Sequence, residues 1–433
     1  MSFKPFSFLR NIFSQKPIRQ KLLITLVILI VFRLTAHIPA AGINREQLAN
    51  IFSGNAFFAL LDIFSGGTLG NFSILALGLN PYINASIILQ LFTYISPRLE
   101  ELQEEGEYGQ EKINQYTRFL TVPLAALQSF TVYFILQKQG VIGVLSPIAL
   151  LALVVTMTAG TMFAVWLGEL ITEYGIGNGV SFLIFAGIVS RLPLSFGQTI
   201  SSNFSTHALS YLIVVVLSVL IIALVVFVSD AVRRVTIQYS RRSRRSLVLG
   251  DSTYLPLKLN HAGVIPIIFA VSLVVLPSVI GQFLIASGNP SFSQFAGQML
   301  NLFRADGAFY TITYFVLVVG FTYFYTSVNF KPEKIAERLQ KNGAFVPGIR
   351  PGDATAKHLS NIMSRITLFG AFFLGFIAVM PSVVQKFVQV PNLMVGGTGI
   401  LIVVSVVLEV MRDLQSRLVA GRYDKFLQNP SKS

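Results

Sequence analysis

Cysteine is absent from this 433-residue chain, which excludes disulfide bonds and thiolate chemistry. Charged residues are also scarce. They make up 12% of the sequence against 53% hydrophobic residues, and the mean hydropathy is +0.67. A soluble fold of this length needs more polar surface than such a composition supplies. The composition therefore predicts a membrane protein with several spans.

Clusters of chemically active side chains are equally scarce. His37, His207, His261 and His358 are scattered and lack metal-ligand spacing with carboxylates. The glycine-rich stretches GGTLGN and GIGNG lack the lysine and hydroxyl of a P-loop. The sequence therefore predicts no catalytic residue, no metal site and no cofactor, and a partner must supply any energy.

Acidic residues near the spans are few. Glu169 and Glu173 form a close pair that shares one helix face. A solvated helix end is the favoured interpretation, and a membrane-embedded hydrolase is the alternative. Arg33 in the first span and Glu409 in the last either form a buried pair or face water.

Apolar stretches of about 20 residues predict ten membrane spans. They lie near residues 22–40, 74–95, 119–137, 148–172, 178–192, 210–229, 262–283, 309–328, 365–384 and 396–413. The first has no small-residue cleavage site, so we interpret it as a retained span rather than a signal peptide. The fifth is short and opens with Gly175, Gly177 and Gly179, which weakens its boundary.

Basic residues orient the predicted bundle. The net charge is +14, and lysine and arginine gather before the first span and after the sixth and eighth. The loops near 191–209 and 284–308 are almost uncharged, so both termini are predicted to be cytoplasmic. The loop at 100–111 is acidic, but acidic residues have little influence on orientation.

The span count suggests two halves. Five spans on each side of about residue 200 must enter the membrane in opposite directions if they are repeats. Topology alone suggests this repeat. We divide the chain into a cytoplasmic segment 1–21, an N-terminal half 22–195, a C-terminal half 196–413 with cytoplasmic loops 230–261 and 329–364, and a cytoplasmic tail 414–433.

The second predicted span carries Asn80, Asn84 and Gln90 in an otherwise apolar helix. Polar amides at membrane depth are costly unless they face protein or water. This helix therefore lines an interface or a pore, which makes transport the first functional hypothesis.

The second long cytoplasmic loop is patterned. KPEKIAERLQKNG predicts a helix that begins near Pro332 and ends before Gly343. The prolines and glycines of AFVPGIRPGD then hold Arg350 on a turn. The basic residues of this loop and of the loop at 230–261 are explained by the ordinary excess of positive charge on the cytoplasmic side. The alternative is a docking surface for a cytoplasmic partner that carries phosphate or acidic groups.

Six blocks, in this order, resemble the SecY family: GGTLGNFSILALGLNPYINASIILQL, EKINQYTRFLT, EYGIGNGVSFLIFAGI, LPLKLNHAGVIPIIFA, NGAFVPGIRPGDATAKHL and VGGTGILIVVSVVLEV. The resemblance implies an all-α polytopic membrane protein with two inverted five-helix halves around an hourglass pore. It also implies a protein-conducting channel that passes secretory polypeptides and releases transmembrane segments into lipid.

The family's pore ring carries over residue by residue. Its positions are Ile83 and Ile87 in PYINASI, Ile184 in SFLIFAG, Ile268 in VIPIIF and Ile402 in GGTGILI. Ile83 and Ile87 are spaced to share one helix face. Branched aliphatic side chains block ions by dewetting and offer a passing chain no hydrogen bonds.

The resemblance implies three further features. A plug falls at about 55–71 and includes Asp62, Gly66, Gly67 and Gly70; a re-entrant loop is the alternative. A lateral gate lies between about 80–94 and 263–277, with Asn80, Asn84 and Gln90 on it. Cytoplasmic docking residues are Arg350, Arg244 and Arg245, with Arg241 and Arg242 in the same basic stretch.

Implied partners are small SecE-like and SecG-like membrane subunits, the SecA ATPase or the ribosome, polypeptide substrates and the lipid bilayer. The implied location is the bacterial inner membrane or an organelle membrane descended from it. A secondary transporter that binds a small solute at Asn80, Asn84 and Gln90 is the rival hypothesis.

Overall fold

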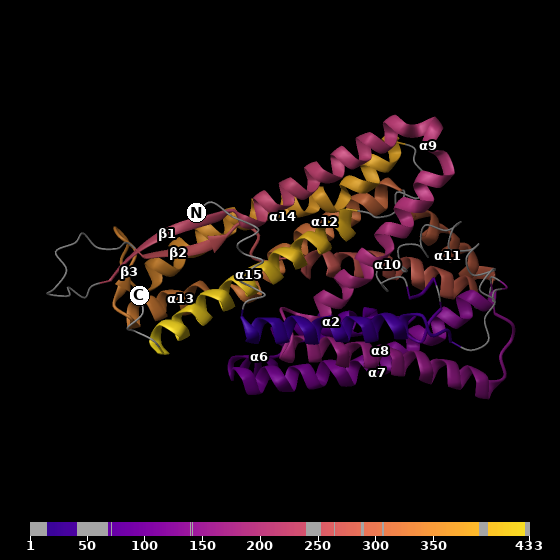
Figure 1. The fold of residues 1–433 in the computed structure, drawn as a ribbon, viewed down its shortest axis with the longest axis horizontal. Helices are drawn as coiled ribbons and strands as arrows, with labels where there is room; N and C mark the ends of the chain where they lie inside the picture. The colour runs from indigo at the N-terminus through magenta and orange to yellow at the C-terminus, as the bar shows by residue number, and fades with distance from the viewer. Residues whose placement is uncertain are drawn as a thin grey trace. The chain divides into compact units, whose positions relative to one another are not determined.

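The computed structural model describes residues 15–40, 68–70, 72–138, 140, 142–239, 253–263, 265–286, 290–304, 307–388 and 397–428. It is mostly helical (Figure 1), and each of the ten predicted stretches overlaps a helix. Within these residues, the stretches long and apolar enough to span a membrane are Glu107–Gln137, Pro147–Tyr174, Ile265–Gln282, Ala308–Lys341 and Asp353–Met380. Gly179–Ser190 and Val215–Asp230 are shorter apolar stretches.

The chain divides into two compact units. The first contains residues 1–208, 275–305 and 390–433, and the second contains 209–274 and 306–389. This division gives the last helix to the first unit, whereas the inverted-repeat hypothesis assigns it to the C-terminal half. The repeat itself stays a prediction.

Helices α2 (Lys16–Ala36), α7 (Glu107–Lys138) and α8 (Pro147–Tyr174) lie alongside one another in the first unit (Figure 1), with α8 in contact with both of the others. α5 (Asn80–Ile95) packs on α7. A buried apolar cluster joins Phe72, in the turns before α5, to Leu136 on α7 and Met157 on α8. α11 (Pro290–Leu302) and α15 (Gly397–Gln428) also belong to this unit.

The second span begins later than predicted. Residues 72–79 form turns, and α5 starts at Asn80 rather than near 74. Phe72 and Gly78 have positive φ angles of 42° and 55°, which a helix does not tolerate. The turns are fixed by hydrogen bonds instead, including Thr68 Oγ1 to the carbonyl of Leu75 at 2.6 Å and Ala40 N to the carbonyl of Phe72 at 2.9 Å.

Several predicted loops are helical. α9 runs from Gly179 to Asp230, so the predicted loop at 191–209 is helix. Pro290–Leu302 (α11) occupies most of the predicted loop at 284–308. The acidic loop is also mostly helix, as α6 (Pro97–Glu104) and the start of α7. The length of an apolar stretch identifies the part of a helix that crosses the membrane. It does not detect polar turns that continue the helix beyond that part.

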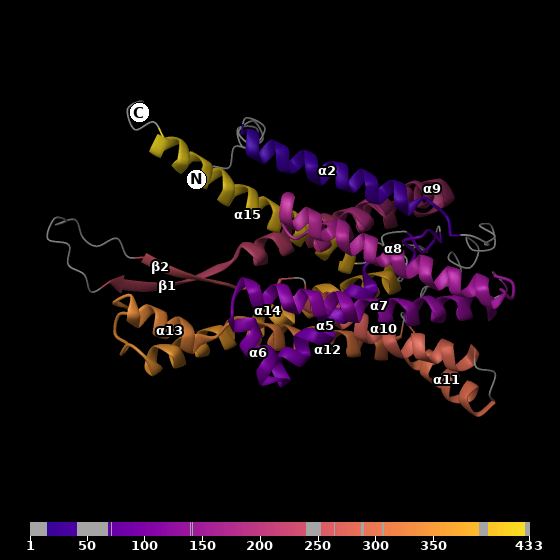
Figure 2. The same cartoon turned by 90° about the horizontal axis from the view of Figure 1, so that it is seen from below.

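The second unit combines two long helices with a small sheet. α12 (Ala308–Asn329) packs along α14 (Asp353–Val388), and α13 (Pro332–Lys341) packs on α14. Strands β1 (Val232–Tyr239), β2 (Thr253–Lys258) and β3 (Ala344–Phe345) form an antiparallel sheet in the order β2-β1-β3. Figure 2 shows β1 and β2 at the same end of this unit as α13. α10 (Ile265–Ala286) begins in this unit and ends in the first.

The small sheet was not predicted, and it adds three strands to an otherwise helical fold. In β1, buried Val235 and Ile237 alternate with more exposed neighbours. Arg234 lies opposite Pro256, and a proline is tolerated there because β2 is an edge strand. Open sheet edges do not occur in hydrocarbon, so this sheet lies outside the membrane.

Candidate functional site

The first turns of α5 carry several buried apolar residues. Ile83 and Ile87 are 8% and 6% exposed, and they lie one helical turn apart as the sequence predicts. Pro81 occupies the first turn, where its missing N–H costs nothing. The helix therefore begins just before the first predicted ring residue.

Three other helices carry the remaining predicted ring residues. Ile184 on α9 is 7% exposed and Ile402 on α15 is 1% exposed. Ile268 on α10 is half-buried and belongs to the second unit, whereas the other four isoleucines belong to the first.

The turn between α8 and α9 is built on glycine. Gly177 has a φ of +70°, which favours glycine. A Cβ on Gly179 would lie 1.8 Å from the carbonyl oxygen of Gly168, so these two helices meet at their backbones. Asn178 Oδ1 accepts a hydrogen bond from Ser181 N at 3.2 Å and caps the start of α9. The uncertain start of the fifth predicted span is thus a tight turn whose conformation the glycines determine.

Gly177 also contacts α15. Its backbone N–H donates to Asp413 Oδ2 at 3.3 Å, and Arg417 Nε donates to the same oxygen at 2.8 Å. Ile176 packs in a buried cluster with Ile18, Leu414 and Leu418. Sequence reasoning missed Asp413, because its partner is a backbone group far away in the chain.

Arg33 contacts α9 on the other side of Ile184. Its guanidinium donates to the carbonyl of Ala186 and the hydroxyl of Ser190, and to the carbonyl of Gly187 at 3.4 Å. From the sequence, Arg33 was expected either to pair with Glu409 or to face water. In the structure, Arg33 has its partners on α9. The presence of an arginine inside an apolar stretch was the sequence signal that it would need polar partners within the protein.

The predicted gate amides differ in their surroundings. Asn80 and Asn84 are half-buried on α5. Gln90 Nε2 donates to Ser86 Oγ at 3.5 Å within the same helix. The hydrogen bond found for Gln90 is therefore local rather than interhelical.

The acidic pair does not form a two-carboxylate site. Glu169 Oε2 accepts a hydrogen bond from Arg118 Nη1 at 3.2 Å, and Glu173 is exposed. Within the described residues, no group of three or more histidine or acidic side chains is arranged to hold a metal.

Arg350 lies on the predicted turn. It is exposed between Gly348 and Gly352, whose φ angles are +81° and +93°. The Arg350 carbonyl accepts a hydrogen bond from Thr355 Oγ1 at 2.8 Å, which ties the turn to α14. The helix Pro332–Lys341 and the stop at Gly343, with a φ of +67°, are confirmed.

Some predicted residues lie outside the described part of the chain. These are Asp62, Gly66 and Gly67 of the predicted plug and Arg241, Arg242, Arg244 and Arg245 of the basic loop. Gly70 lies in a described turn at 68–70.

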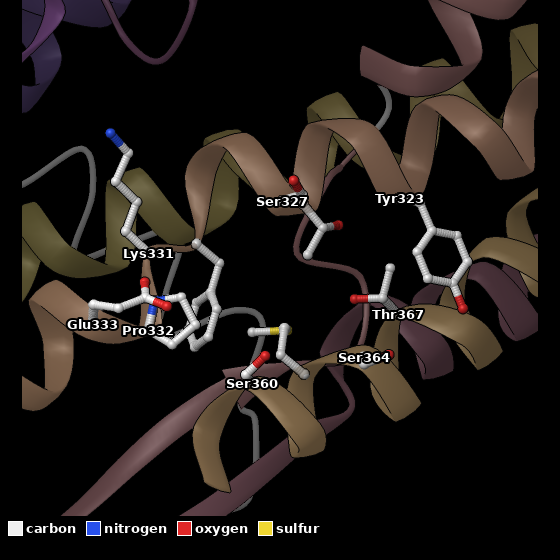
Figure 3. Close-up of a pocket in the computed structure, with 11 residues that line it drawn as sticks. Tyr323, Ser327, Lys331, Pro332, Glu333, Ser360, Ser364 and Thr367 are labelled. Atoms are coloured by element: carbon white, nitrogen blue, oxygen red, sulfur yellow. The ribbon is translucent and has the colours of Figure 1, made fainter. Parts of the chain in front are cut away.

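A pocket of about 370 Å³ lies between α12 and α14 in the second unit. Figure 3 shows Tyr323 and Ser327 on α12 and Ser360, Ser364 and Thr367 on α14 around it. No predicted site residue lines this hydroxyl-rich recess, and no sequence motif marked it.

Comparison with known proteins identifies the family. A SecY family model matches residues 73–411. The SecY translocase subunit of Aquifex aeolicus is 42% identical over 97% of this chain and 99% of its own length. The Thermotoga maritima subunit is 40% identical over 97% of both chains.

Solved structures support the same fold. A protein-conducting channel superposes with a TM-score of 0.64 at 18% identity over 92% of each chain. Sec61 in a canine ribosome–channel complex gives a TM-score of 0.62 at 19% identity, also over 92% of each chain. Because the family model covers most of the sequence and full-length relatives are 40% and 42% identical, the chain belongs to the SecY family.

Proposed function

We propose that this SecY-family channel subunit conducts unfolded secretory polypeptides through a ring formed by Ile83, Ile87, Ile184, Ile268 and Ile402, and releases transmembrane segments sideways into lipid. The subunit is a channel and not an enzyme. The observation that carries the proposal is the burial of four of these isoleucines on three helices of one unit.

The chemistry of the ring suits this task. Its side chains are branched and apolar, so a closed ring excludes ions by dewetting. They also offer no hydrogen bonds, so an extended polypeptide of any sequence slides past without being retained. A plug at about 55–71 adds a second seal on the outer side.

The proposed lateral gate uses residues of about 80–94, on α5, and about 263–277, at the start of α10. Asn80 and Asn84 are its candidate polar contacts, because they stay half-buried along α5. Hydrogen bonds between amides in hydrocarbon are worth only about 1 kcal/mol. An entering apolar helix can displace contacts of that strength.

Cytoplasmic partners supply the energy. Exposed Arg350 presents a fork of donors on a turn fixed to α14, which suits a motor ATPase such as SecA or the phosphates of a ribosome. Arg241, Arg242, Arg244 and Arg245 extend this basic surface. Relatives are translocase subunits, and a similar fold occurs in ribosome-bound channels. Small SecE-like and SecG-like subunits complete the complex.

The protein is a multi-pass membrane protein of the bacterial SecY type. The distribution of lysine and arginine supports a cytoplasmic position for both termini. We assign it to the bacterial inner membrane.

Site-specific crosslinking tests the channel. Ile87→Cys, in a chain without other cysteines, is challenged with a secretory polypeptide stalled in transit. We expect a crosslink at this position and none from a matched Leu368→Cys on the exposed face of α14, where the side chain is 49% exposed. Absence of the Ile87 crosslink, together with saturable uptake of a small solute, would support a transporter instead.

A further inference from the structure

The turn that precedes α9 and the first part of α9 each have one contact with α15. At one end, Gly177 N donates to Asp413 Oδ2. Further along α9, Ile188 Cγ2 lies 3.4 Å from the position of a Cβ on Gly399, which is near the start of α15. The order of these contacts means that the two helix segments run antiparallel.

The predicted ring residues lie between these two contacts. Ile184 on α9 falls between Gly177, in the preceding turn, and Ile188, and Ile402 falls between Gly399 and Asp413 on α15. Both isoleucines are buried. A sliding movement of α15 along α9 would therefore change the relative depth of Ile184 and Ile402.

The contact at Asp413 resists such sliding. Asp413 Oδ2 accepts the Gly177 N–H from outside α15 at 3.3 Å, whereas its 2.8 Å contact with Arg417 Nε lies within α15 and does not join the two segments. Beside it, Ile176 is 1% exposed and packs on Ile18, Leu414 and Leu418. The hydrogen bond thus lies next to a packed apolar cluster from three elements.

Gly177 fits this contact through its backbone conformation. Its φ of +70° aims the backbone N–H at α15 in a conformation that other residues rarely adopt. A Cβ at this position would make only an ordinary contact with Val410 Cγ2 on α15, at 3.5 Å, so the backbone conformation rather than the available space favours glycine here.

We propose that Asp413 is a positioning residue for the channel ring: by accepting the Gly177 N–H it fixes the start of α9 on α15 and keeps Ile184 and Ile402 at matched depth in the closed channel. The inference rests on the proposed ring. The required group is the acceptor oxygen rather than the negative charge, since the donor is an uncharged backbone N–H.

Ion leakage of the closed channel tests this role. The complete complex is reconstituted in planar bilayers, and its resting conductance is measured for Asp413→Ala, Asp413→Asn and Arg417→Gln. Alanine removes the acceptor, asparagine keeps an acceptor oxygen, and Arg417→Gln removes only the ion pair. We expect a several-fold rise in conductance for Asp413→Ala and no measurable change for the other two.

Two further measurements make the result decisive. The thermal midpoint of each variant separates positioning from stability. A lower midpoint for Asp413→Ala with unchanged conductance would overturn the proposal, and so would equal leakage from Asp413→Asn. If Asp413→Ala does not assemble, Gly177→Ala is measured instead, because a side chain at a φ of +70° strains the same contact. An unchanged resting conductance in Gly177→Ala would also refute the role.

A ring variant keeps the two hypotheses apart. Replacing Ile83 and Ile402 by glycine removes side chains from the ring itself and should raise the resting conductance. Leakage in this variant without leakage in Asp413→Ala rejects the positioning role alone. If the resting conductance of the ring variant is unchanged, the proposed ring itself is wrong.

Discussion

The helices of the first unit and the sheet end of the second unit are held together in different ways. In the first unit, glycines bring backbones into contact: a Cβ on Gly160 of α8 would lie 2.1 Å from the carbonyl oxygen of Ile74. At the sheet end, larger apolar side chains form the contacts, in a buried cluster that includes Val235, Leu257 and Leu359.

The difference follows from the surrounding solvent. Between helices in lipid there is little hydrophobic driving force, so close van der Waals packing over small residues replaces it. The sheet has open edges and lies in water, where burial of apolar area drives association. The glycine contact of the first unit should therefore be most sensitive to added side-chain volume, and the apolar cluster of the sheet end to removed volume.

Removal of volume should damage the sheet end most. Leu359 on α14 is fully buried in the apolar cluster. We expect Leu359→Ala to cost about 2–5 kcal/mol of local stability. Hydrogen exchange at the backbone amides of β1 measures this loss as faster local opening.

A matched leucine on the same helix controls for composition. Leu368 on α14 is 49% exposed, so Leu368→Ala should change β1 protection by no more than about 0.5 kcal/mol. Equal effects from the two leucines would contradict a water-driven core at the sheet end.

Addition of volume should damage the first unit. Gly160→Ala forces a methyl group against the Ile74 backbone, which cannot rotate away as a side chain would. We expect a cost of about 1–3 kcal/mol, seen as a lower thermal midpoint in lipid nanodiscs. Gly320→Ala on α12 is the control, because nothing lies within 4 Å of its Cβ position. A drop of similar size in the control would indicate a general intolerance of alanine.

These contrasts also explain what the sequence could predict. Apolar length predicted the helices well: the eighth stretch, 309–328, became Ala308–Asn329. The helix from Pro332 and the turn at Arg350 were predictable because proline and glycine specify backbone locally. β1 escaped notice because its alternation is short and interrupted by two arginines.

Long-range contacts were the other gap. The ring positions came from family resemblance, since any single isoleucine is equally suited to core packing or to lipid. Neither Asp413 nor the pairing of Arg118 with Glu169 has a local signature, because each joins groups far apart in the chain. The prediction of spans gives the approximate depth of such a residue in the membrane, but it does not show which residues of other helices contact it.

Acidification should produce the smallest effect and should reach only the sheet end. His261 packs edge-on against Phe330, with ring centroids 5.8 Å apart. Burial, with a smaller contribution from the nearby Lys258 ammonium, lowers the pKa of His261.

The unfolded chain therefore binds a proton at His261 more readily than the folded one. The resulting stability is present above the ordinary pKa of about 6.5 and is lost as the pH falls from there through the lowered pKa of the folded state. Hydrogen exchange at β1 should accelerate slightly between pH 7.5 and pH 5.5, while protection of α8 stays constant. His261→Gln should remove this pH dependence. A response that persists in this variant would assign it to another group, and an equal response in α8 would break the contrast between the two regions.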